Sequence, residues 1–279
     1  MRIKIPLLLF ACFLSSNFLF SQNPVTDKDE NDSTSEATKS YFSATTTFNT
    51  NSGFAGRFEK TYNPVIGASA SYNFKSGIYF SAETDLTPTQ NVLFGGFSLK
   101  GGYEFDIIED LLSADVNYTH FFAENTTKIL SEMVGSASGT LSCDLDWFSL
   151  AFTPAYNYGN KTNDILLTFE INKTINLFTI NKEPISITPG IRTFAGTQKL
   201  LELNANKKNA KKNIVVTALN AEYAKFNYLN TDLEIPISYT HKALTIELTP
   251  TLSLPANLVQ SARFISNPFF VDLSVSIKI

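Results

Sequence analysis

The sequence has little of the residues on which most enzymes and metal centres depend. Its 279 residues include two cysteines, two histidines and one tryptophan. Two cysteines exclude a disulfide framework and a multi-cysteine metal site, and two histidines leave little room for a histidine-based one. Glycine-rich phosphate loops, paired-cysteine motifs and His-Glu metal motifs are also missing. We therefore expect no metal, no cofactor and no catalytic residues.

Charge is scarce as well, since only 17% of the residues are charged and the formal net charge is −4. An acidic chain of this kind, with a pI near 5.3, does not suit nucleic-acid binding. A mean hydropathy of −0.02 excludes a helical membrane protein with many spans. Aromatic residues, in contrast, are abundant, with 24 Phe and 11 Tyr, which argues against a disordered chain.

The first forty residues have the pattern of an export signal and a linker. Basic Arg2 and Lys4 precede an apolar run over 5–20, which is short for a membrane anchor. A polar stretch ends the run, so we predict a signal peptide over 1–22. Residues 23–40 are rich in Asp, Glu, Ser and Thr, which predicts a disordered acidic linker. The remaining residues, 41–279, form the predicted folded domain.

Apolar and polar residues alternate along this domain, which is the pattern of strands with two unlike faces. In the last segment Leu273, Val275 and Ile277 share an apolar face, and Ser274 and Ser276 lie on the other. The segment before it repeats the pattern. Twelve such segments can be identified, at 41–50, 64–74, 77–85, 94–106, 111–122, 137–146, 148–158, 164–174, 185–194, 229–240, 243–253 and 268–279.

The connections between these segments alternate strictly between short turns and longer loops. Short turns fall at 75–76, 107–110, 146–147, about 175–183 and 241–242, and the longest loop covers 195–228. Short turns at one end and long loops at the other are typical of membrane barrels. The sequence therefore predicts an all-β fold, a transmembrane antiparallel up-and-down β-barrel of about twelve strands. Its short turns would lie in the periplasm and its long loops outside the cell.

A water-soluble β-sandwich or lipocalin-like barrel is the alternative, because it would also alternate, with its apolar face turned inward. All twelve segments carry an apolar face, which is more than a sandwich core of this size needs. The polar face is rich in Ser and Thr and poor in charge, as in a wet barrel interior. Both features favour the membrane barrel.

Several motifs resemble small porin-like outer-membrane β-barrel proteins of Bacteroidota. They are the signal ending Phe-Ser-Gln at 20–22, the terminal segment SNPFFVDL at 266–273, and the preceding pair LEIPISY at 233–239 and LTPTLSLP at 248–255. The resemblance implies the outer membrane of a Gram-negative bacterium, with lipid and lipopolysaccharide as surroundings. It also implies that the last strand is recognised by the barrel-assembly machinery, although Ile279 stands where such proteins usually end in Phe.

Charged residues on the polar face mark the predicted lumen. The candidates for lining it are Lys100, Glu104, Asp115, Arg192, Asp232, Glu234 and Glu247. The last four come from three successive segments, and a turn at 241–242 would place Glu234 and Glu247 opposite or diagonal to each other. An excess of carboxylates favours cations. We expect a narrow channel for small solutes with an acidic lumen, or else a plugged structural or partner-binding barrel in an outer-membrane assembly.

Two further features carry weaker hypotheses. His120 lies near the outer end of a lipid-facing strand, where outer-membrane phospholipases carry a histidine and a serine, but Phe122 stands where that serine would be. A lipid-facing hydrolase is therefore disfavoured against a non-enzymatic barrel. The 195–228 loop holds five lysines, Lys199, Lys207, Lys208, Lys211 and Lys212, ahead of an apolar stretch at 214–219. Such a loop could be solvated, contact lipopolysaccharide or fold inward as a lid.

Overall fold

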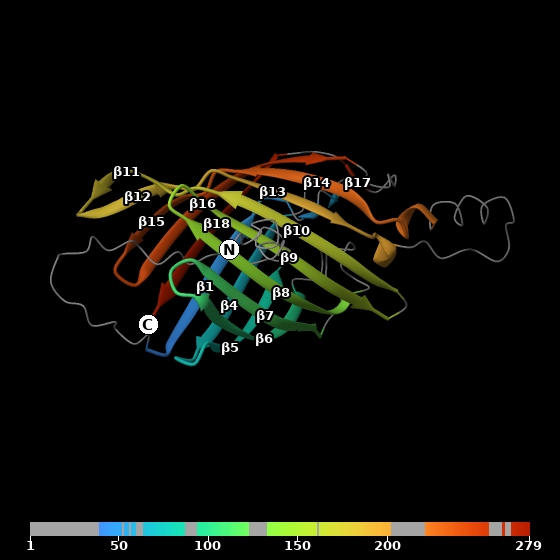
Figure 1. Ribbon diagram of the computed structural model, residues 1–279, viewed down its shortest axis with the longest axis horizontal. Coiled ribbons are helices and arrows are strands. Elements are labelled where there is room, and N and C mark those ends of the chain that lie inside the picture. The colour runs from blue at the N-terminus through green and yellow to red at the C-terminus, as the bar shows by residue number, and fades with distance from the viewer. Residues whose placement is uncertain are drawn as a thin grey trace, which may run out of the picture.

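The protein is a closed, twelve-stranded antiparallel β-barrel in the computed structural model (Figure 1). The structure describes residues 39–51, 53–55, 57–59, 64–86, 94–122, 133–160, 162–201, 221–256, 264–265 and 269–279. The predicted signal peptide and all but the last two residues of the predicted linker lie outside these residues. So do the apolar stretch at 214–219 and four of the five lysines of the 195–228 loop.

Twelve strands form the wall, and three of them are divided into two parts. They are β1 (Tyr41–Asn49), β4 (Val65–Asn73), β5 (Ile78–Leu86), β6 (Phe94–Ile108), β7 (Leu112–Phe121), β8 (Met133–Leu145), β9 (Phe148–Gly159), β10 (Asn163–Asn172) with β11 (Ile175–Ile180), β12 (Glu183–Ile187) with β13 (Gly190–Gly196), β14 (Asn227–Glu234) with β15 (Ile237–His241), β16 (Leu244–Pro255) and β18 (Phe269–Lys278). The last strand pairs with both β16 and β1, so no sheet edge runs the length of the wall. This closure confirms the predicted fold.

Smaller elements lie outside the wall. Strands β2 (Gly53–Phe54), β3 (Arg57–Glu59) and β17 (Phe264–Ile265) form a separate three-stranded sheet. One 3-10 turn, η2 (Lys199–Leu201), follows β13. Within the described ranges, no helix has the length and apolar character needed to cross a membrane.

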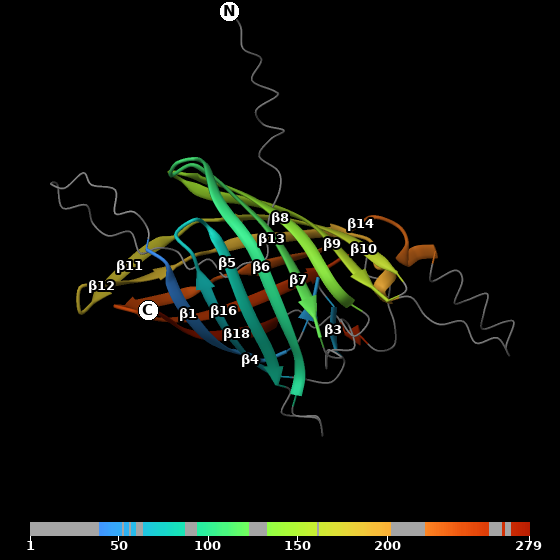
Figure 2. The same cartoon turned by 90° about the horizontal axis from the view of Figure 1, so that it is seen from below.

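The two rims of the barrel differ, as the alternation of connections predicts. The turns β4–β5, β6–β7, β8–β9, β11–β12 and β15–β16 lie at the same end as the C-terminus and the start of β1 (Figure 2). We call this end the short-turn rim and the opposite end the long-loop rim. The five turns are tight because few residues connect each pair of strands, and Gly77, Asp110 and Lys182 adopt positive φ angles there.

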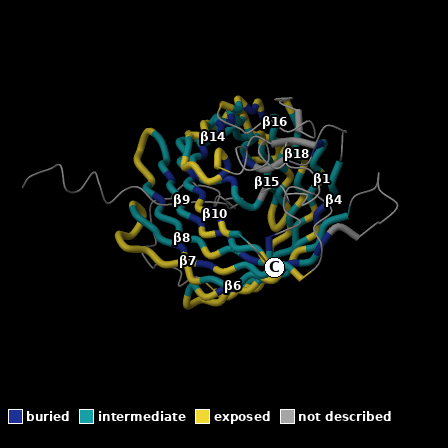
Figure 3. Tube along the Cα trace, turned by 90° about the vertical axis from the view of Figure 1, so that its right-hand side faces the viewer, coloured by how far each residue is buried: buried dark blue, intermediate teal, exposed yellow. Residues whose placement is uncertain are grey.

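Apolar side chains cover the outside of the wall. Leu244, Ile246 and Leu248 of β16 are each about 40% exposed, and the outward residues of β18 match them. Exposed and less exposed residues alternate along the strands in Figure 3. A soluble protein would bury such a face, so this surface suits contact with lipid. The predicted outward set of these two strands is confirmed.

One predicted turn is wrong. Residues 175–183 were expected to connect two strands, but β11 continues to Ile180 and the turn is Asn181 and Lys182. The register between β11 and β12 shifts between Asn176 and Phe178. This bulge puts one extra residue into the strand, so the simple alternation on which the prediction depended is interrupted there.

Candidate functional site: the lumen

The strand register brings inward side chains into rows that run around the barrel. Glu170 of β10 lies opposite Arg192 of β13, and Arg192 lies opposite Asp232 of β14. Glu234 lies two residues further along β14, opposite Gly190. Because alternate residues of a strand face the same side, these four charged side chains all point into the lumen. The sequence predicted three of them as a group.

Arg192 is held by two carboxylates from the strands on either side of it. Its Nε lies 3.0 Å from Glu170 Oε2, and its Nη1 lies 2.8 Å from Glu234 Oε1. The Arg192 side chain is 27% exposed, and the two glutamates are less exposed. Charge-assisted bonds of this length are among the stronger polar contacts in proteins. We call these three residues the arginine network.

Asp232 belongs to a separate hydrogen-bonded chain on the neighbouring strands. Asn230 Nδ2 donates to Asp232 Oδ1 at 2.5 Å, and Ser253 Oγ donates to Asn230 Oδ1 at 3.1 Å. All three residues are buried. Asp232 is therefore held in place by a neutral donor although it lies opposite Arg192 in the register.

Glu247 does not meet Glu234, contrary to the prediction. Glu234 pairs with Thr251, and Glu247 pairs with Ser238. The reason is the hairpin turn, because His241 still pairs with Leu244 and the turn is shifted to Lys242 and Ala243. Glu247 is therefore separated from the arginine network by about 13 Å along the strand. Thr249 Oγ1 donates to its carboxylate at 3.3 Å.

A second polar network lies on the wall formed by β5 to β8. The Tyr79 hydroxyl donates to Asp115 Oδ2 at 2.8 Å, and Asn117 Nδ2 donates to Asp115 Oδ1 at 2.5 Å. Ser138 Oγ in turn donates to Asn117 Oδ1 at 2.9 Å. We call Tyr79, Asp115, Asn117 and Ser138 the aspartate network. Its members come from three strands, β5, β7 and β8, and it spans β6, so it ties that wall together on the lumen side.

The other two candidates lie beside the aspartate network. Lys100 Nζ is 5.8 Å from the centre of the Tyr79 ring, a distance at which an ammonium group is attracted to the ring face. Glu104 lies opposite Asp115 in the β6–β7 pair and is exposed towards the short-turn rim. The seven predicted lumen residues thus divide between two walls of the barrel rather than forming one constriction.

Glu170 and Tyr79 are missing from the predicted candidates. The alternation does predict that Glu170 lies on the polar face, but its pairing with Arg192 required the register between β10 and β13, which the sequence does not contain. Tyr79 has a sequence signal, because the adjacent strand carries Gly101 and Gly102 and Tyr79 lies opposite Gly102. A side chain at Gly102 would collide with the Tyr79 ring. The glycine therefore makes room for a tyrosine that lies flat against the inner wall.

Small inward residues line the wall between the two networks. Ala151, Thr153 and Ser142 on β8 and β9 face inward and are buried. Four inward hydroxyls have no hydrogen-bond partner among the described residues, those of Thr140, Ser142, Thr153 and Thr251. Buried hydroxyls without a protein partner are normally satisfied by water. No group of three or more His, Cys, Asp or Glu residues in the described ranges could hold a metal ion.

His120 lies among aromatic residues on the outer face. The Tyr118 hydroxyl is 3.3 Å from His120 Nδ1 and hydrogen-bonded to the Tyr158 hydroxyl. The edge of the Phe122 ring lies against the imidazole, with ring centres 4.5 Å apart. This cluster resembles the aromatic belts found at membrane interfaces more than a nucleophile and its base.

The base of the 195–228 loop is fixed to the wall by an aspartate. Asp164 Oδ1 accepts hydrogen bonds from the Lys199 backbone N–H at 2.6 Å and the Thr197 hydroxyl at 2.7 Å. Asp164 Oδ2 accepts from the Leu200 N–H at 3.0 Å. At the other end, Tyr223 is buried, and its carbonyl accepts from Gln198 N–H at 2.7 Å. Asp164 is therefore an inward carboxylate with a structural role.

Comparison with known proteins supports the fold but assigns no family. No family model matches the chain, and no curated protein matches it. Among solved structures, the chain is similar to a KdgM porin, with 11% identity, a TM-score of 0.50, and coverage of 84% of this chain and 98% of that one. A NanC porin structure gives 13% identity, a TM-score of 0.49, and coverage of 85% and 100%. The likeness to the KdgM porin shows a shared barrel fold.

Proposed function

We propose that the protein is a narrow outer-membrane channel for small solutes that favours cations. The observation that carries this proposal is the composition of the inner wall, where small hydroxyl and alanine side chains separate two polar networks. Between the two networks the small inward side chains leave room for a water path, and the unpartnered hydroxyls support a wet interior. The porin-like fold and the lipid-suited outer face support a Gram-negative outer membrane as its location.

The charges of the lumen support a preference for cations. Arg192 is shared between Glu170 and Glu234, so the arginine network as a whole carries an excess negative charge. Asp115, Asp232 and Glu247 add further inward carboxyl groups. Carboxylates that line a pore with low-dielectric walls attract cations and repel anions.

The size of the barrel limits what could pass. Twelve strands about 4.8 Å apart, tilted by about 40°, give a backbone radius near 12 Å. Inward side chains reduce this radius further. Small ions and metabolites fit such a passage, whereas folded proteins and large polysaccharides do not.

Planar-bilayer recordings with the purified chain test this function. In a salt gradient we expect discrete conductance steps and a reversal potential on the cation-selective side. Glu247→Gln should reduce the cation preference while leaving the fold intact, because Glu247 lies outside the arginine network. Glu109→Gln, in the exposed β6–β7 turn of the short-turn rim, is the matched control. A conducting Glu247→Gln variant with unchanged selectivity would place Glu247 outside the permeation path.

A plugged structural or partner-binding barrel is the second candidate, and the two polar networks favour it. Each crosses several strands and is largely buried, as expected of side chains that fill a small barrel. Under this alternative the folded protein would insert into bilayers without conducting. A heat-modifiability gel on the same sample separates that result from a failure to fold. Lipopolysaccharide, the assembly machinery and an inward-folded lysine loop remain proposals for its partners and regulation.

A further inference from the structure

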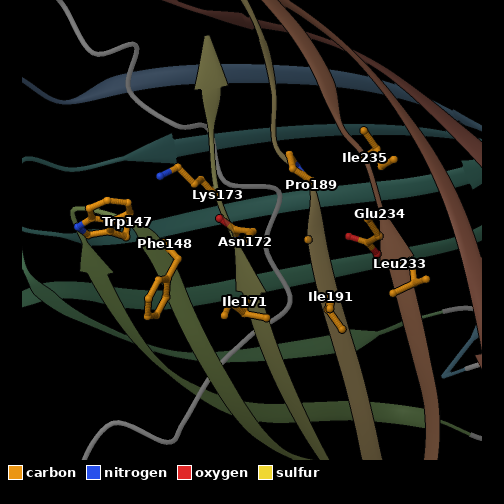
Figure 4. Close-up of a pocket in the computed structure, with 11 residues that line it drawn as sticks. Trp147, Phe148, Ile171, Asn172, Lys173, Pro189, Ile191, Leu233, Glu234 and Ile235 are labelled. Carbon is orange, nitrogen blue, oxygen red and sulfur yellow. The ribbon is translucent and has the colours of Figure 1, made fainter. Parts of the chain in front are cut away.

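An apolar groove of about 480 Å³ lies on the outside of the barrel, where β10 gives way to β11 (Figure 4). Ile171, Ile191, Leu233 and Ile235 form its walls, from three adjacent strands. Trp147 and Lys173 lie at its end near the short-turn rim. A hollow of this kind in the surface of a sheet needs a physical cause.

The cause is a line of prolines across neighbouring strands. Pro189 follows β12, Pro236 follows β14, and Pro250 lies in β16 beside them. Proline has no N–H and cannot complete a strand ladder. Their carbonyls still accept hydrogen bonds, from Lys173 N–H to Pro189 at 3.1 Å, from Thr188 N–H to Pro236 at 2.9 Å and from Ile235 N–H to Pro250 at 3.2 Å. The wall is therefore joined here by fewer bonds than a regular ladder supplies.

The neighbouring hairpin deepens the groove. The β8–β9 turn ends at Trp147 and Phe148, whereas the next strand continues past that level as β11. In the described structure β11 pairs with β12 alone, so the wall has a notch beside Trp147. The groove is therefore bounded by apolar walls on both sides and opens towards the surroundings of the barrel.

The charges around the groove favour an apolar ligand with a negative charge at one end. Lys173 Nζ lies 5.2 Å from the centre of the Trp147 ring, at the rim where lipid headgroups meet aromatic residues. Glu234, the carboxylate that reaches the groove, is bonded to Arg192 from the lumen side. A ligand in the groove thus meets apolar walls along its length and a cation at its end.

We propose that this groove binds one acyl chain of a phospholipid with an anionic headgroup, and that the Lys173 amine pairs with the lipid phosphate. The groove is continuous with the apolar outer face, so acyl chains already surround it in a membrane. The proposal depends on the transmembrane fold and not on conduction through the lumen.

Trp147 provides a direct test because it is the only tryptophan of the chain. The full chain is reconstituted into phosphatidylcholine vesicles that contain a small fraction of acyl-brominated lipid, either phosphatidylglycerol or phosphatidylcholine. Bromine quenches nearby tryptophan fluorescence. Both lipids carry a phosphate, but in phosphatidylcholine the choline cation neutralises it. We therefore expect brominated phosphatidylglycerol to be enriched about fivefold beside Trp147 relative to brominated phosphatidylcholine, which is the effect of one lysine on an anionic lipid. Added salt should weaken this preference.

Two variants separate a specific site from general attraction to the rim. Lys173→Gln should abolish most of the preference, whereas Lys75→Gln, on an exposed turn of the same rim, should leave it intact. Ile191→Phe should narrow the groove and lower quenching by both lipids, with Ile165→Phe on the same outer face as its control. Equal quenching by the two lipids in the native chain, or an unchanged preference in Lys173→Gln, would overturn the proposal. A heat-modifiability gel establishes that each variant is folded.

Discussion

The wall from β5 to β9 and the wall from β10 to β16 share the same alternation of apolar and polar residues. They differ in whether their strands run without a break. In the first region the strands run unbroken for nine to fifteen residues. In the second, three successive strands are divided at the same level, and β11 has a bulge. The first region holds the hydrogen-bonded aspartate network and the second the ion-paired arginine network. The comparison shows that the alternation of apolar and polar residues decides which way side chains face. The supply of backbone N–H donors, which prolines lack, decides whether a strand runs unbroken.

The largest expected effect tests whether the two regions lie equally deep in the membrane. Val116 is at the middle of β7 and faces outward, and Ile180 is at the tip of the β11–β12 hairpin. Val116→Arg should lower the free energy of unfolding by about 2–4 kcal/mol, and Ile180→Arg by about 0–1 kcal/mol, because the cost depends on depth. Urea titration in vesicles measures both. Equal costs would mean that the hairpin is as deeply embedded as the centre of β7.

A smaller effect should distinguish the two polar networks. Arg192→Met leaves Glu170 and Glu234 without their shared cation in a confined space, which should cost about 1–3 kcal/mol. Tyr79→Phe removes one hydrogen bond from Asp115, which keeps Asn117 as a donor, and should cost about 1 kcal/mol. The same titration compares them. A cost for Arg192→Met no larger than that of Tyr79→Phe would indicate that lumen water screens the ion pairs.

The smallest expected effect concerns two inward glycines. A methyl group at Gly102 would lie 2.7 Å from Tyr79 Cε1, so Gly102→Ala should displace the ring and cost about 1 kcal/mol. At Gly190 the nearest heavy atoms are Asn172 Cβ at 3.1 Å and the Ile171 carbonyl oxygen at 3.3 Å. Gly190→Ala should therefore require a shift of only a few tenths of an ångström and cost less than Gly102→Ala. Near-ultraviolet circular dichroism should change for Gly102→Ala, and an unchanged spectrum would argue against ring displacement.

Much of the wall could be predicted because period-two alternation is a local property. Residues such as Leu244, Ile246 and Leu248 reveal their outward face without reference to any partner strand. The error at 175–183 arose where a bulge breaks that local rule. The error at Glu247 has another origin, since moving a hairpin turn by one residue changes every partner on the facing strand.

The amino-acid sequence by itself determined the number of strands, their faces, the alternation of short and long connections, and the scarcity of charge inside. These follow from residue types at fixed spacing, which each strand expresses independently. Only the tertiary structure decided that Arg192 is shared by Glu170 and Glu234, that Tyr79 reaches Asp115, and that prolines from separate strands lie at the same level of the wall beside one groove. Those features depend on register, and register is set by pairing between strands that are distant in the chain.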